Sequence, residues 1–481
     1  MKLVNVTVDD KQVQVPENST ILVAARSAGV SIPTLCYLNL ADFGCVNKSA
    51  SCRVCVVEVE GRRNLAPSCA TPVTDGMVVK TNTIKALHSR KTVLELMLSD
   101  HPKDCLVCQK SGECELQDIA VEFGMKEIRF EGKESTYRKD ISKSIVRDMD
   151  KCIMCRRCET MCNEVQTVGA LSAVNRGFDS VVATAMEMDL NDSVCTYCGQ
   201  CVAVCPTGAL VERDATWEVL SKLADPTKTV IVQTAPAVRA ALGEEFGLPA
   251  GTSVTGKMVA ALRKLGFDKV FDTDFAADLT IMEEASELLD RLTRHMNGDT
   301  TVKLPLLTSC CPAWVKFFEH QFSDMLDIPS GCKSPHEMFG AVAKTYLAEK
   351  LDVKPEDMIV VSVMPCVAKK YESARPELGH GGTKDVDIVI TTRELAQMIK
   401  EAGINFNELE DQDFDNPLGE SSGASVIVGT TGGVIEAALR TAYEWLTKET
   451  LENVEFEALR GLDGTKEATV NINGQDIKIA V

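Results

Sequence analysis

The stretch Cys152-Ile-Met-Cys155-Arg-Arg-Cys158-Glu-Thr-Met-Cys162 returns further along the chain as Cys195-Thr-Tyr-Cys198-Gly-Gln-Cys201-Val-Ala-Val-Cys205. In both copies two residues separate the first three cysteines, and a fourth cysteine follows after three more residues. Thiolates at this spacing can hold an inorganic cluster from one short loop. The repeat therefore decides the fold of residues 140–215, and the flanking segments can be interpreted outward from it.

This spacing is the double [4Fe–4S] pattern of bacterial ferredoxins, in which the fourth cysteine of each run binds the other cluster. Pro206 follows Cys205 as the pattern expects, whereas Asn163 follows Cys162, a departure that leaves the ligand set intact. We expect two [4Fe–4S] clusters in this domain. Their ligands are expected to be Cys152, Cys155, Cys158 and Cys205 for one cluster, and Cys195, Cys198, Cys201 and Cys162 for the other.

A second ligand set lies upstream, in a domain expected at residues 81–130, where a predicted helix over 84–100 leads into it. The set has one imidazole and three thiols at the spacing His101-x3-Cys105-x2-Cys108-x5-Cys114. A neutral imidazole in place of a thiolate removes a negative charge, which raises the reduction potential of a cluster. An isolated histidine is usually an ordinary surface or core residue, but its position before a Cys-x2-Cys pair favours a third [4Fe–4S] cluster here.

A third set is expected in an N-terminal β-grasp domain, residues 1–80. Residues 2–15 alternate like a hairpin with a turn at Asp9-Asp10, and residues 19–29 form a predicted helix closed by Gly29. The cysteines here comprise one closely spaced pair and two that lie further away along the chain. This pattern suits a [2Fe–2S] cluster, with a zinc ribbon as the alternative. Cys45 competes with Cys52 for a ligand position, and we favour the tight Cys52-x2-Cys55 loop. The expected ligands are Cys36, Cys52, Cys55 and Cys69.

The composition limits the function classes that need to be considered. The chain has 481 residues, 20 cysteines and a formal net charge of −19, which argues against a nucleic-acid partner. No apolar stretch reaches the eighteen or so residues that span a bilayer, so we expect no membrane insertion. The N-terminus lacks the apolar core of a signal peptide, which predicts a cytoplasmic protein whose thiolates bind metal rather than form disulfides.

The pattern changes after about residue 225. Short apolar runs at 229–232, 358–363 and 386–390 alternate with helical stretches, which is typical of a parallel sheet covered by helices. The chain ends in a predicted hairpin on Asn473-Gly474, with a second strand that is apolar to the last residue. The expected fold class is a multidomain α+β and α/β protein. Its last domain, 225–481, is expected to be a two-lobed α/β domain that lacks its C-terminal part.

Two stretches of this last domain carry chemistry: Thr308-Ser-Cys-Cys-Pro-Ala-Trp314 and Met364-Pro-Cys-Val-Ala-Lys-Lys370. They closely resemble the first two active-site signatures of the [FeFe]-hydrogenases, and the upstream cluster modules resemble the large clostridial-type members. Shorter stretches resemble the same family. They are Thr255-Gly-Lys257, Asp278-Leu-Thr-Ile-Met-Glu-Glu-Ala285, Thr391-Thr-Arg-Glu-Leu395 and Thr431-Gly-Gly-Val434.

The resemblance implies a catalytic H-cluster, a [4Fe–4S] cubane bridged to a diiron unit with CO, cyanide and dithiolate amine ligands. By position, Cys311 and Cys366 are implied cubane ligands, and Cys310 is the implied proton-shuttling thiol. Lys369 and Met364 match residues that hold the ligands of the diiron unit. The implied proton path consists of Glu284, Glu287, Arg291 and Ser330; without the resemblance, Glu284 and Glu287 would be assigned to a solvated helix face.

The third family signature, with two further cysteines, is not in these 481 residues, and Cys332 lies outside any matched motif. The sequence favours part of a longer enzyme. The alternatives are a second subunit that supplies the missing ligands, or a lobe that has lost its cofactor. Smaller departures are Ala237, Ala313 and His336, where serine, glycine and glutamine are common in the family.

The leading hypothesis for function is therefore reversible hydrogen chemistry, H2 ⇌ 2H⁺ + 2e⁻, with H2 and protons as substrates. Electrons would pass along the clusters to or from ferredoxin or an NAD(P)-linked partner subunit in a hetero-oligomer. The N-terminal modules also resemble the cluster-bearing arm of the large NADH:quinone oxidoreductase subunit. The alternative hypothesis is accordingly an electron-transfer subunit without chemistry of its own, and a hydrogen sensor or assembly scaffold is a third.

Overall fold

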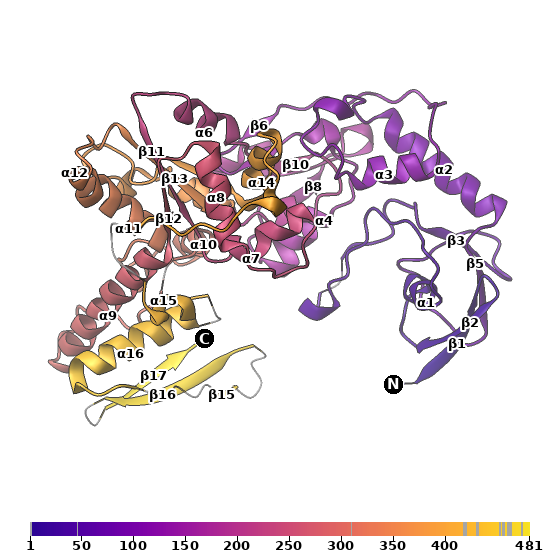
Figure 1. Cartoon of the computed structure of the whole chain (residues 1–481). Coiled ribbons are helices and arrows are strands. Elements are labelled where there is room, and N and C mark those ends of the chain that lie inside the picture. Colours follow the sequence, from indigo (N-terminus) through magenta and orange to yellow (C-terminus); the bar gives the residue numbers. More distant parts are fainter. Residues whose placement is uncertain are drawn as a thin grey trace. The chain divides into compact units, whose positions relative to one another are not determined.

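The computed structural model describes residues 2–481 except Val46, Ser309 and the segments 417–420, 430–431, 452–453, 455–456, 459–463 and 473–474. The chain forms two compact units, Met1–Arg213 and Asp214–Val481, which are coloured along the sequence in Figure 1.

The first unit begins with a mixed five-stranded sheet. In sheet order its strands are β2 (Lys11–Pro16), β1 (Leu3–Val8), β5 (Met77–Lys80), β3 (Val56–Val59) and β4 (Ala66–Pro67). Strand β1 pairs antiparallel with β2 and parallel with β5, while β3 pairs antiparallel with β5 and β4. Val4, Val6 and Val8 alternate along β1 and are buried in one core with helix α1 (Ile21–Ser27). The alternation of residues 2–15 therefore reflects one covered face of this sheet.

Two local predictions for this region are confirmed. The Thr20 hydroxyl accepts a hydrogen bond from the Val23 amide at 3.4 Å and caps α1, and Gly29 adopts φ +69° just beyond the helix. Asp9 and Asp10 both have positive φ between β1 and β2, as a tight hairpin turn requires.

The rest of the first unit is made of short elements around the other cysteine runs. Helix α2 (Ile84–Ser99) confirms the predicted helix, and its C-terminal end leads directly to His101. The remaining elements are α3 (Glu115–Glu122), α4 (Arg157–Thr160), α5 (Gln200–Ala203), the antiparallel sheet β10 (Leu210–Glu212), β7 (Ile145–Arg147), β6 (Asp140–Ile141) and the hairpin of β8 (Ser172–Val174) and β9 (Val181–Ala183). Helices α4 and α5 carry Cys158 and Cys201, which are equivalent positions of the sequence repeat.

The second unit is built on the predicted parallel sheet. Its four strands, in sheet order, are β12 (Lys269–Asp272), β11 (Thr229–Thr234), β13 (Met358–Met364) and β14 (Ile388–Thr391). All neighbouring pairs are parallel. Every residue of β13 is buried, so both faces of the sheet are covered, which explains the continuous apolar run in the sequence.

Helices surround this sheet (Figure 1). Those described in the second unit are α6 (Thr216–Leu223), α7 (Val238–Ala241), α8 (Thr255–Leu265), α9 (Asp274–Met296), α10 (Pro312–Gln321), α11 (Pro335–Val342), α12 (Ala348–Lys350), α13 (Ala368–Glu372), α14 (Thr392–Glu401), α15 (Gly423–Ile427) and α16 (Gly433–Thr447). Thr391 and Glu394 form a capping box at the start of α14. The Glu394 carboxylate also pairs with the buried Lys370 ammonium at 2.7 Å, which fixes α13 against α14.

The chain ends in a small antiparallel sheet of β15 (Glu457–Ala458), β16 (Lys466–Ile472) and β17 (Gln475–Ala480). The pairing of β16 with β17 agrees with the predicted terminal hairpin, although its expected turn at Asn473-Gly474 falls outside the described residues. Ala468, Val470 and Ile472 alternate along β16 and pack with Leu439 of α16.

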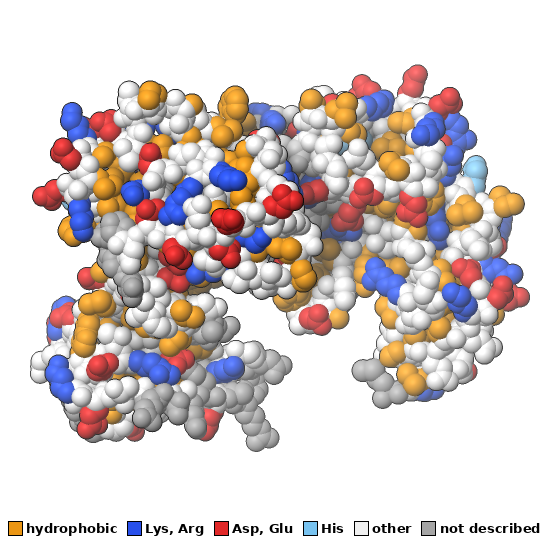
Figure 2. Space-filling view, viewed as in Figure 1, with side chains coloured by type: hydrophobic (Ala, Val, Ile, Leu, Met, Phe, Trp, Pro, Cys, Tyr) orange, Lys and Arg blue, Asp and Glu red, His pale blue; other side chains and the backbone are white. Residues whose placement is uncertain are grey.

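Two surface properties bear on function. Among the described residues, none of the helices is long and apolar enough to cross a bilayer. On the face shown in Figure 2, acidic and basic side chains are interspersed, and no broad basic area stands out.

Candidate functional site

Four thiols meet in the N-terminal part of the first unit. Cys36, Cys52, Cys55 and Cys69 are all buried, with exposed fractions between 1% and 5%. The sulfurs of Cys55 and Cys69 are 3.4 Å apart, and contacts with the Cys52 and Cys69 thiols hold the pKa of Cys36 far below its usual range. Four buried thiols that bond mainly to one another form a donor set that fits a metal cluster.

Cys45 has a different environment. Its thiol donates to the carbonyl oxygens of Phe43 at 3.3 Å and Glu164 at 3.5 Å. The thiol is thus engaged with backbone oxygens, outside the group of four.

The imidazole of His101 is prepared for a ligand role. Its Nδ1 lies 2.9 Å from the carbonyl oxygen of Pro102, whereas its buried Nε2 has no hydrogen-bond partner in the described part of the chain. Donation of the Nδ1 proton to that carbonyl leaves the Nε2 lone pair free, which is the tautomer a metal requires. Burial also lowers the pKa of His101 and keeps the ring neutral.

Burial raises the pKa of the Cys114 thiol, and nearby backbone amides lower it. The charges of Cys108 and Cys105 also raise this pKa, so the three cysteines of the second set lie close to one another. Gly208 faces this group from the far end of the ferredoxin-like segment. A Cβ atom on Gly208 would lie 2.7 Å from the Sγ of Cys108, closer than packed atoms approach. The absence of a side chain at Gly208 therefore leaves the room that the Cys108 thiol occupies.

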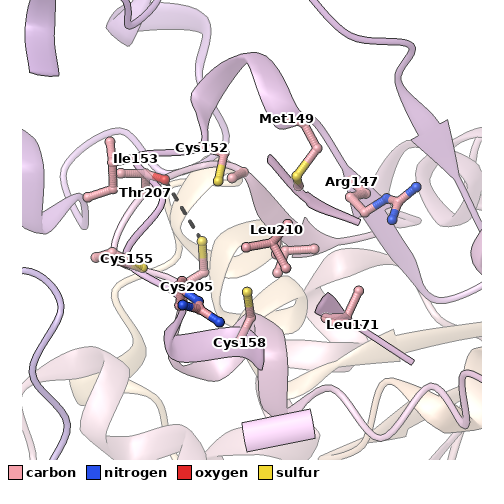
Figure 3. A pocket seen from close by; sticks show the side chains of 14 residues that line it. Arg147, Met149, Cys152, Ile153, Cys155, Cys158, Leu171, Cys205, Thr207 and Leu210 are labelled. Carbon is pink, nitrogen blue, oxygen red and sulfur yellow. Dashed lines mark hydrogen bonds between the residues drawn. The ribbon is translucent and has the colours of Figure 1, made fainter. Parts of the chain in front are cut away.

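The repeated cysteine runs line two separate cavities. One cavity is lined by Cys152, Cys155, Cys158 and Cys205, whose sulfurs surround a common space in Figure 3. The other is lined by Cys162, Cys195, Cys198 and Cys201. In each cavity the fourth thiol comes from the other run, which is the crossed arrangement that the spacing predicted.

The backbone of both runs is shaped alike. Met154 and Tyr197 occupy equivalent positions, both have φ between +50° and +60°, and their amides donate to Cys152 Sγ and Cys195 Sγ at 3.5 and 3.4 Å. Strained backbone of this kind persists where a functional site over-determines it. Burial raises the pKa of the Cys155 thiol to about 12. Without cations, such buried thiols would stay protonated, so the donor set fits metal ions that can hold thiolates.

In the second unit, helix α9 presents Glu284, Glu287 and Arg291 on one face, at positions i, i+3 and i+7. The Glu287 carboxylate accepts from Arg291 Nη2 at 2.6 Å and from the Ser330 hydroxyl at 2.7 Å. Arg291 Nη1 also donates to the Ile328 carbonyl at 2.9 Å and so holds the loop that carries Ser330. The structure thus joins Arg291, Glu287 and Ser330 into one hydrogen-bonded chain.

Glu284 lies next to this chain but is not bonded to it. Its side chain is 1% exposed, and its Oε2 has no hydrogen-bond partner among the described residues. Burial, and then the charge of Glu287, raise the pKa of Glu284 to about 7. Glu284 also lines an apolar cavity of about 520 Å³ bounded by α9, α16 and β17.

The three predicted cysteines of this unit occupy helix starts and loops nearby. Cys311 is the N-cap residue of α10, and Cys366 precedes α13, where the Ala368 amide lowers the pKa of a thiol that burial raises. Burial also raises the pKa of Cys310, Lys369 lowers it, and Glu284 raises it. The Cys310 thiol therefore lies within electrostatic reach of Glu284, and Cys311 within reach of Cys366.

Lys369 connects the Cys310 loop with helix α13. Its ammonium donates to the Cys310 carbonyl at 3.0 Å and to Glu372 Oε2 at 2.7 Å. Met364 ends β13 and is 3% exposed, so it faces a buried environment at the edge of the same region.

Sequence reasoning missed two groups of contacts. The Cys332 thiol donates to Glu287 Oε2 at 3.6 Å, beside Ser330, and its position two residues after Ser330 was the only available signal. His336, Glu337 and Glu372 form a buried group that contacts Lys369 through Glu372. One side-chain nitrogen or oxygen of each residue lies within 4.8 Å of the others. His336 Nε2 lies 2.7 Å from Glu372 Oε2. His336 was noticeable in the sequence only as a departure from glutamine.

Family models match consecutive parts of the chain. Residues 228–481 match the iron only hydrogenase large subunit, C-terminal domain, and residues 1–84 match a 2Fe-2S iron-sulfur cluster binding domain. Between them, residues 90–129 match the NADH-ubiquinone oxidoreductase-G iron-sulfur binding region, and residues 151–209 match a 4Fe-4S dicluster domain.

Individual proteins show the same relationship. The NADP-reducing hydrogenase subunit HndD of Solidesulfovibrio fructosivorans is 68% identical over 100% of this chain and 82% of its own length. Iron hydrogenase 1 of Clostridium pasteurianum is 40% identical over 99% of this chain and 81% of its own length. The mitochondrial NADH-ubiquinone oxidoreductase 78 kDa subunit of Candida albicans (strain SC5314 / ATCC MYA-2876) is 37% identical over 44% of this chain and 28% of its own length.

The resemblance inferred from the cysteine motifs is thereby confirmed. Because one model matches more than half of the chain and two hydrogenases align with nearly all of it, the chain belongs to the iron-only hydrogenase large subunit family.

Proposed function

We propose that this protein catalyses H2 ⇌ 2H⁺ + 2e⁻ and relays the electrons through its iron–sulfur clusters to or from a partner subunit. The observation that carries the proposal is the arrangement on α9: Cys310 lies within reach of Glu284, which adjoins the bonded chain of Glu287, Ser330 and Arg291. A row of side chains that can donate and accept protons is useful to an enzyme that must move protons to and from a buried site. A protein that only carries electrons does not need such a row.

The proposed cofactor of the second unit is the H-cluster, which supplies the iron centre at which the H–H bond is made or broken. Cys311 and Cys366 supply two of its thiolates in this proposal, and Lys369 and Met364 border it. The ammonium of Lys369 is held by the Cys310 carbonyl and by Glu372, so it can offer a remaining N–H to an anionic ligand.

The proposed proton route begins at two neighbouring groups that can each donate or accept a proton, the Cys310 thiol and the Glu284 carboxyl. Cys310 exchanges a proton with the cofactor at its thiol, and Glu284, with a pKa of about 7, takes or returns that proton. Glu287 and Ser330 hold the next positions through their 2.7 Å hydrogen bond. Arg291 keeps the Glu287 carboxylate oriented through its hydrogen bond from Nη2.

The proposed electron route uses the first unit. It consists of one [2Fe–2S] cluster on the N-terminal thiols, one [4Fe–4S] cluster on His101 and its three cysteines, and two [4Fe–4S] clusters in the crossed cavities. Clusters of the ferredoxin type have potentials near −400 mV. The proton/hydrogen couple lies at roughly −0.41 V at pH 7, from about 59 mV per pH unit. Electrons can therefore pass in either direction with little loss of driving force.

For the electron partner we favour an NAD(P)-linked subunit in a hetero-oligomer over free ferredoxin. The relative that is 68% identical to this chain is named as part of an NADP-reducing hydrogenase. Residues 90–129 match a region of NADH-ubiquinone oxidoreductase, and a subunit of that enzyme aligns with 44% of the chain. A nicotinamide nucleotide exchanges two electrons at once, so such a partner needs a cofactor that converts pairs into single electrons.

Infrared spectroscopy of the full-length protein, matured anaerobically, tests the proposal. Stretching bands of CO and cyanide, together with hydrogen evolution from a reduced viologen dye, are the expected result. Absence of these bands beside intact electron paramagnetic resonance signals of the clusters would overturn the proposed catalysis. That outcome would favour the alternative, an electron-transfer subunit. The similarity of the chain to NADH-ubiquinone oxidoreductase supports this alternative.

Replacing Glu284 by glutamine is expected to stabilise the second unit at alkaline pH. A buried carboxyl whose pKa rises from 4.5 to about 7 is destabilising once it must ionise. This cost is absent below pH 4.5, grows up to about pH 7 and then stays near 3 kcal/mol, at about 1.36 kcal/mol per pH unit. The variant should therefore match the wild type at pH 4.5 and exceed it by about 3 kcal/mol at pH 8.

Tryptophan fluorescence during urea unfolding measures this effect, since Trp217, Trp314 and Trp445 all belong to the second unit. The matched control is Glu283→Gln, which changes an exposed neighbour on the same helix. An equal stability difference at both pH values would contradict the assignment of a buried, proton-holding Glu284.

A further inference from the structure

Arg90 is a buried cation in the first unit without an anionic partner among the described residues. It lies on α2, its side chain is 4% exposed, and its Nη2 has no hydrogen-bond partner. The other buried arginines of this unit are paired. Arg147 lies 3.3 Å from the Asp140 carboxylate, and Arg157 lies 2.5 Å from the Glu115 carboxylate.

An unpaired buried guanidinium is unfavourable, because its charge has lost water without gaining a partner. A guanidinium cannot escape this cost by losing its proton at ordinary pH. A missing anion close to Arg90 is therefore needed to explain why the site keeps an arginine.

The surroundings of Arg90 indicate which anion this is. Arg90 Nε donates to the carbonyl of Val56 at 2.9 Å, and Val56 directly follows Cys55. Burial lowers the pKa of Arg90, and the charge of Cys55 is the strongest group that raises it. The nearby Asp9 is already engaged, since its carboxylate accepts from the Thr81 amide at 2.7 Å. The guanidinium thus lies beside the loop that carries Cys55, within electrostatic reach of its thiol, and the charges of Asp9 and Glu122 act on it less strongly.

We infer that Arg90 is the counter-charge of the [2Fe–2S] cluster, an inference that rests on the proposed assignment of that cluster to Cys36, Cys52, Cys55 and Cys69. Four thiolates and two sulfides outweigh two ferric ions, so the cluster is an anion whose negative charge grows by one on reduction. A fixed cation nearby stabilises the reduced state more than the oxidised state and raises the reduction potential. Arg90 is therefore a positioning and tuning residue, which makes this cluster a better electron acceptor.

Arg90→Gln in the full chain is the direct test, with the midpoint potential of the [2Fe–2S] cluster read from a redox titration followed by electron paramagnetic resonance. At the wild-type midpoint, the ratio of reduced to oxidised cluster should fall at least about tenfold, which is about 59 mV for a one-electron couple. Arg90→Lys keeps the charge and should restore most of the ratio. Lys85→Gln, on the exposed side of the same helix, removes an equal charge and should change nothing.

A loaded Arg90→Gln cluster with an unchanged midpoint overturns the inference. If the glutamine variant does not hold the cluster, the thermal stability of the iron-free chains decides. Removal of an unpaired buried cation should leave the iron-free variant at least as stable as the iron-free wild type, whereas a merely structural arginine would leave it less stable. Absence of a [2Fe–2S] signal from the wild type would instead refute the cluster assignment itself.

Discussion

Replacing Cys310 by alanine is expected to lower hydrogen turnover by at least about 100-fold, while the iron content of the protein stays the same. A positioned proton donor contributes on the order of 10²–10⁴ to a rate, and Cys310 is the proposed link between the cofactor and Glu284. Burial and Glu284 both raise the pKa of this thiol. The thiol therefore keeps its proton until a base takes it, which suits a relay and not a permanent iron ligand.

The measurement is hydrogen evolution from reduced viologen, together with iron analysis and infrared spectra of the same samples. Cys45→Ala is the matched control, since it deletes a thiol whose partners among the described residues are two carbonyl oxygens, and it should keep full activity. Serine at position 310 should recover little, because a hydroxyl is a far weaker acid than a thiol. Turnover that survives in Cys310→Ala would remove Cys310 from the proton route.

Replacing Gly208 by alanine is expected to remove the cluster proposed at His101, a loss of about four iron atoms per chain. The new Cβ would lie 2.7 Å from Cys108 Sγ and 3.2 Å from Cδ of Lys151. The lysine carbon belongs to a flexible side chain and can move. The Cys108 sulfur must shift as well, for example by rotation about χ1, and any such shift changes its position relative to Cys105 and Cys114.

Iron analysis and the disappearance of one [4Fe–4S] resonance would show this loss, with the signals of the crossed pair retained. Gly423→Ala is the control, because the space around Gly423 is open and its φ is not positive. A Gly208→Ala protein with its full complement of iron would mean that Cys108 does not hold a cluster from the position seen here.

The sequence was sufficient wherever a signal is local. Gly29 predicted the end of α1, and the apolar run that became β13 predicted a strand buried on both faces. The cysteine spacing predicted which thiols meet, including the exchange of Cys162 and Cys205 between the two runs. In these cases the determining atoms lie within a few residues of one another, or the spacing itself encodes the geometry.

What the sequence could not reveal depends on contacts between distant segments. Cys332 meets Glu287 across 45 residues, and His336 meets Glu372 across 36. Neither pair has a sequence spacing from which the contact could be predicted. Each contact depends on how distant segments pack in the folded second unit. The same holds for Arg90, whose sequence position on an ordinary helix gives no sign that its guanidinium lies beside the Cys55 loop.

The crossed cavities have a consequence for how this part of the protein can change over evolutionary time. Each copy of the repeat lends one thiol to its sister, so neither copy is a self-sufficient module that could be transplanted or discarded alone. A deletion confined to one copy leaves both cavities with an incomplete set of thiols. Both copies must therefore be kept together for either cavity to retain its four thiols.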